Sequence, residues 1–271
     1  MEAHMYVGLD LGGAISGNSI VSVLRDTTRK PHLVRMDPLG HVDDAGHTDP
    51  LSSFEPSDTV LAIDAPLTTP ICLAQSDHCE SGIDCRVEVC ARLWRYNVSR
   101  RRGGRTGLPF LERTCELELR SGRWQTYGIT PKSTMRLGQI MAYGIHLKRR
   151  LVKAGFRAER IIEVYPGASW KIVEGSTVGK ILTDARRDRP KALRYLGESL
   201  RKWIEADLES LMKYDLDGLD SAMCALTAYW HAHGETERVG DEDGWIVVPR
   251  APRLSGASPS RRLDNRESRA S

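Results

Sequence analysis

The stretch MYVGLDLGGAISGNSIVSV, residues 5–23, predicts two β-strands joined by a glycine-rich turn. The first strand is apolar and ends at Asp10, and the second is rich in β-branched residues. Gly12, Gly13 and Gly17 permit backbone angles closed to other residues and leave room for a ligand to approach. Asp10 is therefore expected at the carboxyl end of a central strand, where α/β sheets bind their ligands. The alternative is an aspartate that simply begins a turn.

The apolar pattern of the rest of the chain predicts a mixed α/β fold. Short strands are expected at residues 32–36 and 160–164, and TVLAID, residues 59–64, predicts a strand buried on both faces, as in a central parallel position. The remaining expected elements are helices at residues 133–155, 190–214 and 219–230, and an edge strand or docking segment at residues 245–249. In this order the first three strands form a meander, and the later strands join in parallel through helical crossovers.

Composition divides the chain into a core, an insertion and a tail. Residues 67–130 are irregular and hold five of the six cysteines and an arginine run, so we expect an insertion there. Residues 1–66 and 131–250 form the predicted core, and residues 251–271 predict a disordered tail. The tail holds five arginines and two acids, which equals the chain's formal net charge of +3. A nucleic-acid ligand would therefore have to be held by local patches rather than by the bulk charge.

The sequence favours a cytoplasmic protein without a membrane partner. No basic segment followed by an apolar run begins the chain, so no signal peptide is expected. No apolar run approaches the roughly 20 residues that cross a bilayer. Without an export signal, the six cysteines are expected to be reduced thiols or metal ligands rather than disulfides. The oligomeric state is not indicated.

Acidic residues recur at the ends of the predicted strands. Asp10, Asp64 and Glu163 each end a strand, and Asp217 and Asp220 stand three apart at the start of an apolar helix. Hydrolysis of a phosphodiester uses divalent cations, and two Mg²⁺ or Mn²⁺ ions about 3.5–4 Å apart are held by such hard oxygen ligands. Three or four convergent carboxylates are the minimum for such a site.

Each acid also has a structural alternative. Asp217 suits a helix N-cap, and Asp220 suits a first turn, where the helix dipole favours negative charge. Asp64 could begin a turn, and Glu163 could pair with an arginine. These separate structural roles do not readily explain why acids end three strands and why a pair of aspartates also begins a buried helix.

Four ordered motifs, GLDLGG, IDAPL, IEVYPGASW and DGLDSAMCALTAYW followed by GWIVVP, resemble the DUF429 family. The resemblance covers most of residues 5–249 and implies a ribonuclease H-like fold with a five-stranded sheet flanked by helices, and nuclease activity. The pattern of one acid on the first strand, one on the fourth strand and a D-x-x-D pair on the last helix is similar to RuvC-type resolvases. This resemblance implies that Asp10, Asp64 and Asp220 are the core metal ligands, with Asp217 as the fourth. Glu163 belongs to the family motif. The chain departs from the family in its longer cysteine-rich insertion and in the lack of an obvious helix before residues 59–64.

Cysteines in the insertion offer a second metal site. Four of them have six, five and four residues between them: Cys72, Cys79, Cys85 and Cys90. Four thiolates could hold Zn²⁺ or an iron–sulfur cluster, although no CxxC pair of a zinc ribbon occurs. The alternative is that they are simple reduced cysteines, as are Cys115 and Cys224.

The segment LWRYNVSRRRGGRTG, residues 93–107, offers a nucleic-acid contact. Its arginines are Arg95, Arg100, Arg101, Arg102 and Arg105. Together with Trp94 and Tyr96 they could contact phosphates and stack on bases. The alternative is a solvated basic loop.

Three functions compete. The first is a divalent-metal-dependent nuclease, in which Asp10 bridges the metals, Asp64 and Asp220 complete their shells, and Asp217 or Glu163 orients water. The second is an actin-like phosphotransferase or ATPase, because GLDLGGAISG resembles the first phosphate loop of that class, but the duplicated domain of that class has no counterpart in this chain. The third is a non-catalytic nucleic-acid-binding or partner-binding module.

Overall fold

The structure of the 271-residue chain is a computed structural model. It describes residues 4–12, 19–39, 51, 53–74, 86, 88, 91, 95, 113–121, 131–175, 178, 181 and 188–250. Within these, the side chains of residues 72, 73, 120, 121 and 131–137 are not described.

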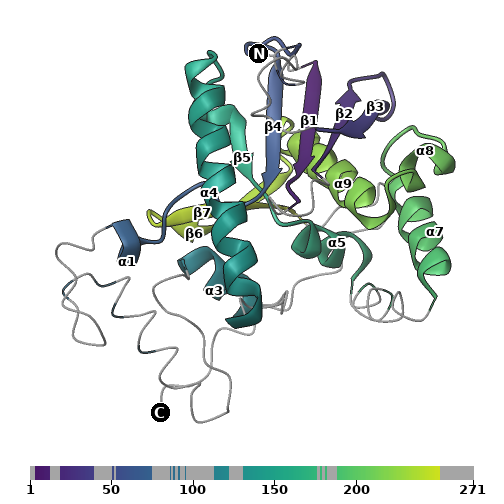
Figure 1. Ribbon diagram of the computed structural model, residues 1–271. Helices are drawn as coiled ribbons and strands as arrows, with labels where there is room; N and C mark the ends of the chain where they lie inside the picture. Colours follow the sequence, from purple (N-terminus) through teal and green to yellow (C-terminus); the bar gives the residue numbers. More distant parts are fainter. Residues whose placement is uncertain are drawn as a thin grey trace, which may run out of the picture.

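A mixed five-stranded sheet with the order β3-β2-β1-β4-β5 forms the centre of the fold (Figure 1). Its strands are β1 (Met5–Asp10), β2 (Ile20–Arg25), β3 (His32–Pro38), β4 (Thr59–Asp64) and β5 (Ile161–Glu163). The pairs β1–β2 and β2–β3 are antiparallel, whereas β4 is parallel to β1 and β5 is parallel to β4. The predicted meander and the predicted parallel addition of the later strands are both confirmed.

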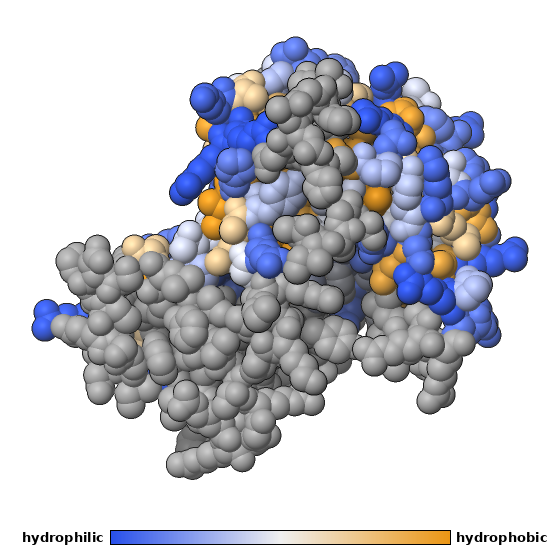
Figure 2. Space-filling view, viewed as in Figure 1, coloured by the Kyte–Doolittle hydropathy of each residue, from blue (hydrophilic) through white to orange (hydrophobic). Residues whose placement is uncertain are grey.

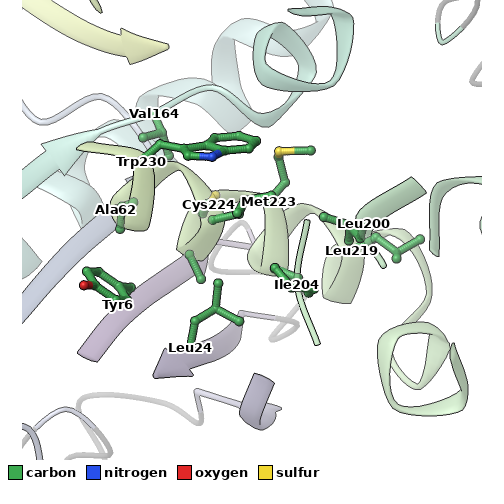
Figure 3. Close-up of a cluster of buried hydrophobic side chains, with 14 of the residues drawn as sticks. Tyr6, Leu24, Ala62, Val164, Leu200, Ile204, Leu219, Met223, Cys224 and Trp230 are labelled. Carbon is green, nitrogen blue, oxygen red and sulfur yellow. The ribbon is translucent and has the colours of Figure 1, made fainter. Parts of the chain in front are cut away.

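Helix α9 (Asp215–Ala232) covers one face of the sheet. Almost every side chain of its middle is apolar and buried, so the helix can pack across three strands at once. Figure 3 shows part of this cluster, in which Tyr6 and Ala62 of the sheet gather with Leu219 and Met223 of α9.

Helix α4 (Pro131–Lys153) supplies the cluster of the opposite face. There Val7 and Leu61 of the sheet gather with Leu147 and Leu151 of the helix. Because successive residues of a strand point to opposite faces, the continuous apolar runs of β1 and β4 supply both clusters. The predicted burial of residues 59–64 on both faces is confirmed.

A close approach between α9 and β1 fixes where the helix lies. A Cβ atom at Gly8 would lie 2.1 Å from the backbone oxygen of Ser221 and 2.2 Å from the backbone nitrogen of Ala225. The Ser221 hydroxyl donates to the Gly8 carbonyl oxygen at 3.1 Å and lies 2.8 Å from the hydroxyl of Ser22. Only a glycine in β1 allows the helix backbone to rest directly on the strand.

The single helix predicted at residues 190–214 is wrong, because the segment forms α7 (Arg189–Leu200) and α8 (Leu208–Met212). Between the two helices, the Glu205 backbone accepts from Leu33 N–H at 2.9 Å and donates to the Pro31 carbonyl at 2.8 Å. The chain therefore leaves the helix to pair its backbone with the outer edge of β3.

A two-stranded antiparallel hairpin of β6 (Thr236–Asp241) and β7 (Gly244–Pro249) follows α9. The strand expected at residues 245–249 is confirmed, but its partner β6 was not predicted. A parallel bridge joins Val247 of β7 to Val164, just beyond β5, and a similar bridge joins His32 of β3 to Glu205. Both edges of the five-stranded sheet therefore meet another segment of the chain.

Helix α3 (Thr114–Ser121), from the predicted insertion, packs on this hairpin. Its Cys115 and Leu119 share a buried cluster with Val239 and Ile246. The other elements of the described part are α1 (Ile71–Ala74), the 3-10 helix η3 (Ala158–Arg160) and α5 (Pro166–Glu174). The division into residues 1–66, 67–130 and 131–250 stays a prediction, and the tail, residues 251–271, lies outside the described residues.

Figure 2 shows hydrophilic and hydrophobic residues intermixed on the described part of one face. Among the described residues, the exposed large apolar side chains are Val34, Val152, Tyr195 and Trp245. No helix in the described part is both long enough and apolar enough to cross a membrane. The cytoplasmic location stays a prediction.

Candidate functional site

Asp10 and Asp64 lie side by side at the carboxyl edge of the sheet. They are the last residues of β1 and β4 and form a direct pair in the parallel register. The residues before them, Leu9 and Ile63, are fully buried, whereas both aspartates are half-buried. The two carboxylates therefore stand where the apolar core opens to the surface.

Helix α9 brings two more acids to this edge. Asp220 directly precedes Ser221, which rests on Gly8 two residues before the end of β1. The charge of Asp220 raises the pKa of both Asp10 and Asp64, and the charge of Asp217 raises the pKa of Asp10 and Asp220. The four aspartates named as metal ligands from the sequence are thus close enough to act on one another.

The four carboxyls hold their protons tightly. Burial, followed by the charges of the other three aspartates, raises the pKa of Asp10 to about 9. Burial and the charges of Asp220 and Glu163 raise the pKa of Asp64 well above its ordinary value. Burial also raises the pKa of Asp220 to about 7 and raises the pKa of Asp217. The group consequently resists full ionisation unless a cation offsets its charge.

The described part of the chain supplies little positive charge to this group. Among the described residues, no lysine, arginine or histidine forms an ion pair with any of the four aspartates. Among the described residues, Arg189 pairs with the neighbouring Asp215 at 2.6 Å and lowers the pKa of Asp217 only as the smallest of its influences. Asp215 also has a positive φ of 60°, an uncommon backbone conformation that often occurs at functional sites.

The donor set fits Mg²⁺ or Mn²⁺. Carboxylate oxygens are the hard ligands that these ions take, and divalent charge is what the clustered aspartates lack. In the described part, the group whose ligand atoms all lie within 4.8 Å of one another is a different one, Cys115, Glu116 and Glu163, and no three of the four aspartates meet that limit.

Glu163 is engaged elsewhere. Its two oxygens lie 2.5 and 2.8 Å from the guanidinium nitrogens of Arg113, and the N–H of Leu67 donates to it at 2.7 Å. This is the pairing with an arginine that the sequence left open. The carboxylate reaches the aspartates only through its charge, which raises the pKa of Asp64.

Arg113 also neutralises the group of Cys115, Glu116 and Glu163. Its guanidinium is almost fully buried and lies 2.6 Å from the Glu116 carboxylate. Burial raises the pKa of the Cys115 thiol, so the sulfur stays protonated and is a poor metal ligand. The guanidinium of Arg113 therefore supplies the positive charge that balances these carboxylates, and a metal ion is not required there.

The second set of predicted sites lies mainly outside the described residues. The side chain of Cys72 and the whole of Cys79, Cys85 and Cys90 fall there, as do Arg100, Arg101, Arg102 and Arg105. Arg95 is described, is exposed, and pairs with Glu88 at 3.3 Å. The zinc, iron–sulfur and nucleic-acid predictions for this region stay predictions.

Sequence reasoning missed three residues that organise the site: Gly8, Arg113 and Trp170. The indole N–H of Trp170 donates to Oδ1 of Asp220 at 2.7 Å, and this bond lowers the pKa of Asp220 against the effect of burial. Trp170 closes the motif IEVYPGASW, so a signal was present for it. Arg113 has no local signal, because its partner Glu163 is 50 residues away.

No family model, curated protein or solved structure matches this chain.

Proposed function

We propose that the chain is a divalent-metal-dependent nuclease that hydrolyses phosphodiester bonds in DNA or RNA. The observation that carries the proposal is the meeting of four aspartates from β1, β4 and α9 at one edge of the sheet, without a pairing cation among the described residues. We further infer that the fold is ribonuclease H-like and that the chain belongs with the DUF429 family. The strand order β3-β2-β1-β4-β5 supports that inference.

The four aspartates have different roles in this proposal. Asp10 is the aspartate whose pKa is raised by burial and by the charges of all three others, so it suits a bridging ligand. Asp64 and Asp220 would complete the ligand set, because the charge of each also raises the pKa of Asp10. Asp217, the more exposed of the α9 pair, suits the orientation of a water molecule. When bound, Mg²⁺ or Mn²⁺ would activate that water and stabilise the leaving oxygen.

Nucleic acid is the proposed partner because its backbone presents the phosphodiester and benefits from nearby arginines. Arg95 and Arg189 are exposed in the described part, and each is paired with an acid from which a phosphate would have to take it. The arginines of residues 100–105 would add to them.

The test is a cleavage assay on single-stranded and duplex DNA and RNA, an RNA–DNA hybrid and a four-way junction, with Mg²⁺, Mn²⁺ or EDTA. We expect metal-dependent cutting of at least one substrate, which Asp10→Asn abolishes. Asp58→Asn is the matched control, because it makes the same change just before the opposite end of β4. Cutting that is equal in wild type and Asp10→Asn, or that persists in EDTA, would overturn the proposal. Binding without cutting of any substrate would favour the non-catalytic binding module.

A further inference from the structure

Trp170 is a fully buried side chain whose single polar atom is directed at the aspartate group. Its relative exposure is 1%, and its indole nitrogen donates to Asp220 Oδ1 at 2.7 Å. Most buried tryptophans serve packing, and the N–H then finds whichever acceptor is near. Here the acceptor is one oxygen of a proposed metal ligand.

The surroundings of Trp170 leave it little freedom. Helix α5 begins with Pro166 at its first position, a residue preorganised for a helix start. The neighbouring Ser169 places its hydroxyl 3.3 Å from that of Thr227 in α9, which fixes α5 along the helix that carries Asp220. Since the ring itself lies in the main apolar cluster, donor and acceptor are held by two helices packed on each other.

A hydrogen bond to one oxygen sets the rotation of a carboxylate. The bond to an ionised acceptor is of the stronger, charge-assisted kind, and it is short here. With Oδ1 of Asp220 engaged by Trp170, Oδ2 is the oxygen that accepts no hydrogen bond from a described residue. Groups that hold a metal ligand in this way commonly change metal affinity when they are removed.

We propose that Trp170 is a positioning residue for metal binding, which fixes the Asp220 carboxylate so that Oδ2 is presented to the ion. This inference rests on the metal-dependent function proposed above, and it goes beyond it by assigning a role to a residue that never touches the ion. The aspartates supply the charge, and Trp170 supplies the orientation of one of them.

The experiment measures Mn²⁺ binding by calorimetry for wild type, Trp170→Phe and Trp203→Phe. Phenylalanine keeps an aromatic ring and removes the N–H. Trp203 is the matched control, because its indole nitrogen is also buried but has no hydrogen-bond partner in the described part, and its ring packs against Trp230. We expect Trp170→Phe to weaken Mn²⁺ binding about 10–100-fold, the range seen when such supporting groups are lost. Trp203→Phe should bind as wild type does.

A second readout separates orientation from packing. The indole N–H resonance of Trp170, identified by its absence in Trp170→Phe, should shift when Mg²⁺ is added to wild type, and that of Trp203 should stay in place. Equal Mn²⁺ affinity in wild type and Trp170→Phe, equal weakening in both variants, or an unmoved Trp170 resonance would each overturn the positioning role. Wild type that binds no Mn²⁺ would instead overturn the proposed function itself.

Discussion

Asp10 and Asp220 bind protons more tightly in the folded chain than in the unfolded one. Their pKa values are raised from 3.8 to about 9 and about 7, so their contribution to stability is complete below the unfolded value and is lost as the pH rises through the folded values. We expect the metal-free protein to lose stability between about pH 4 and pH 9, because the folded state alone holds the protons over that range. Urea denaturation in EDTA across that range measures this.

The variant Asp10→Asn tests how much of this pH dependence of stability comes from Asp10. An amide has no charge to bury, so the variant should be more stable than wild type at high pH without metal, and the difference should shrink as the pH falls. Identical pH dependence in the two proteins would contradict the raised pKa of Asp10.

Among the described residues that form ion pairs, Arg113 is the one whose substitution should reduce stability most. Its buried guanidinium satisfies Glu163 and Glu116, so Arg113→Met leaves two carboxylates without their partner. We expect a loss of about 3–5 kcal/mol in the free energy of unfolding, as for other broken buried pairs. Urea denaturation measures it.

Arg95→Met is the control, because Arg95 forms an exposed pair with Glu88 and such pairs contribute about 0–1 kcal/mol. Glu163→Gln added to Arg113→Met should recover part of the loss, since it removes one stranded charge. A loss in Arg113→Met no larger than in Arg95→Met would show that the buried network contributes nothing.

At the scale of elements, the contact between β1 and α9 depends on Gly8. An added Cβ would meet backbone atoms of α9 at 2.1 and 2.2 Å, which no side-chain rotation can relieve. Gly8→Ala should therefore push the helix off the strand and destabilise the protein by about 1–3 kcal/mol or more. It should also weaken Mn²⁺ binding, because Asp220 moves with the helix.

The control is Gly138→Ala in α4, where a Cβ would meet nothing within 4 Å. There the alanine should stabilise by about 0.5–1 kcal/mol, its advantage over glycine inside a helix. Thermal melting of both variants gives the comparison, and equal effects would show that the close approach at Gly8 carries no weight.

Element prediction from the sequence succeeded where the pattern was local. The apolar runs of β1 and β4 and the uncharged middle of α9 are visible in the residues themselves. It failed at residues 201–207, because the helix there is interrupted by backbone pairing with Pro31 and Leu33, which are far away in sequence. It also missed β6, whose sequence TERVGD is largely polar and becomes a strand only through pairing with β7.

At the scale of the whole molecule, metal binding should stabilise the folded state against unfolding. The proposed ligands come from β1, β4 and α9, so unfolding separates them, and an ion that binds only the folded state stabilises it by about 2.7 kcal/mol at 100 times its dissociation constant. We expect Mn²⁺ to raise the melting temperature of wild type and EDTA to reverse this. Asp10→Asn should show no such rise, and an equal rise in both would place the ion elsewhere.

The assembly of the site was only partly accessible from the sequence. Strand ends and helix starts predicted which aspartates meet, because parallel strands share one carboxyl edge. The partner of Glu163 depends on which side chain the packing of distant segments brings within 3 Å, and the sequence carries no local record of that. Trp170 stands at the end of a motif, but the pattern does not show that its N–H donates to Asp220.

The two single bridges at the margins of the sheet have a consequence for the protein at high concentration. An uncovered outer strand offers a ladder of unpaired amides on which another chain can build, and this is a common route to fibres. Glu205 meets the margin of β3, and Val247 meets the chain just beyond the three-residue β5. Glu205 therefore already pairs with the start of β3, and Val247 with the residue after β5, so the extended segment of a second molecule could not pair at either of these two places.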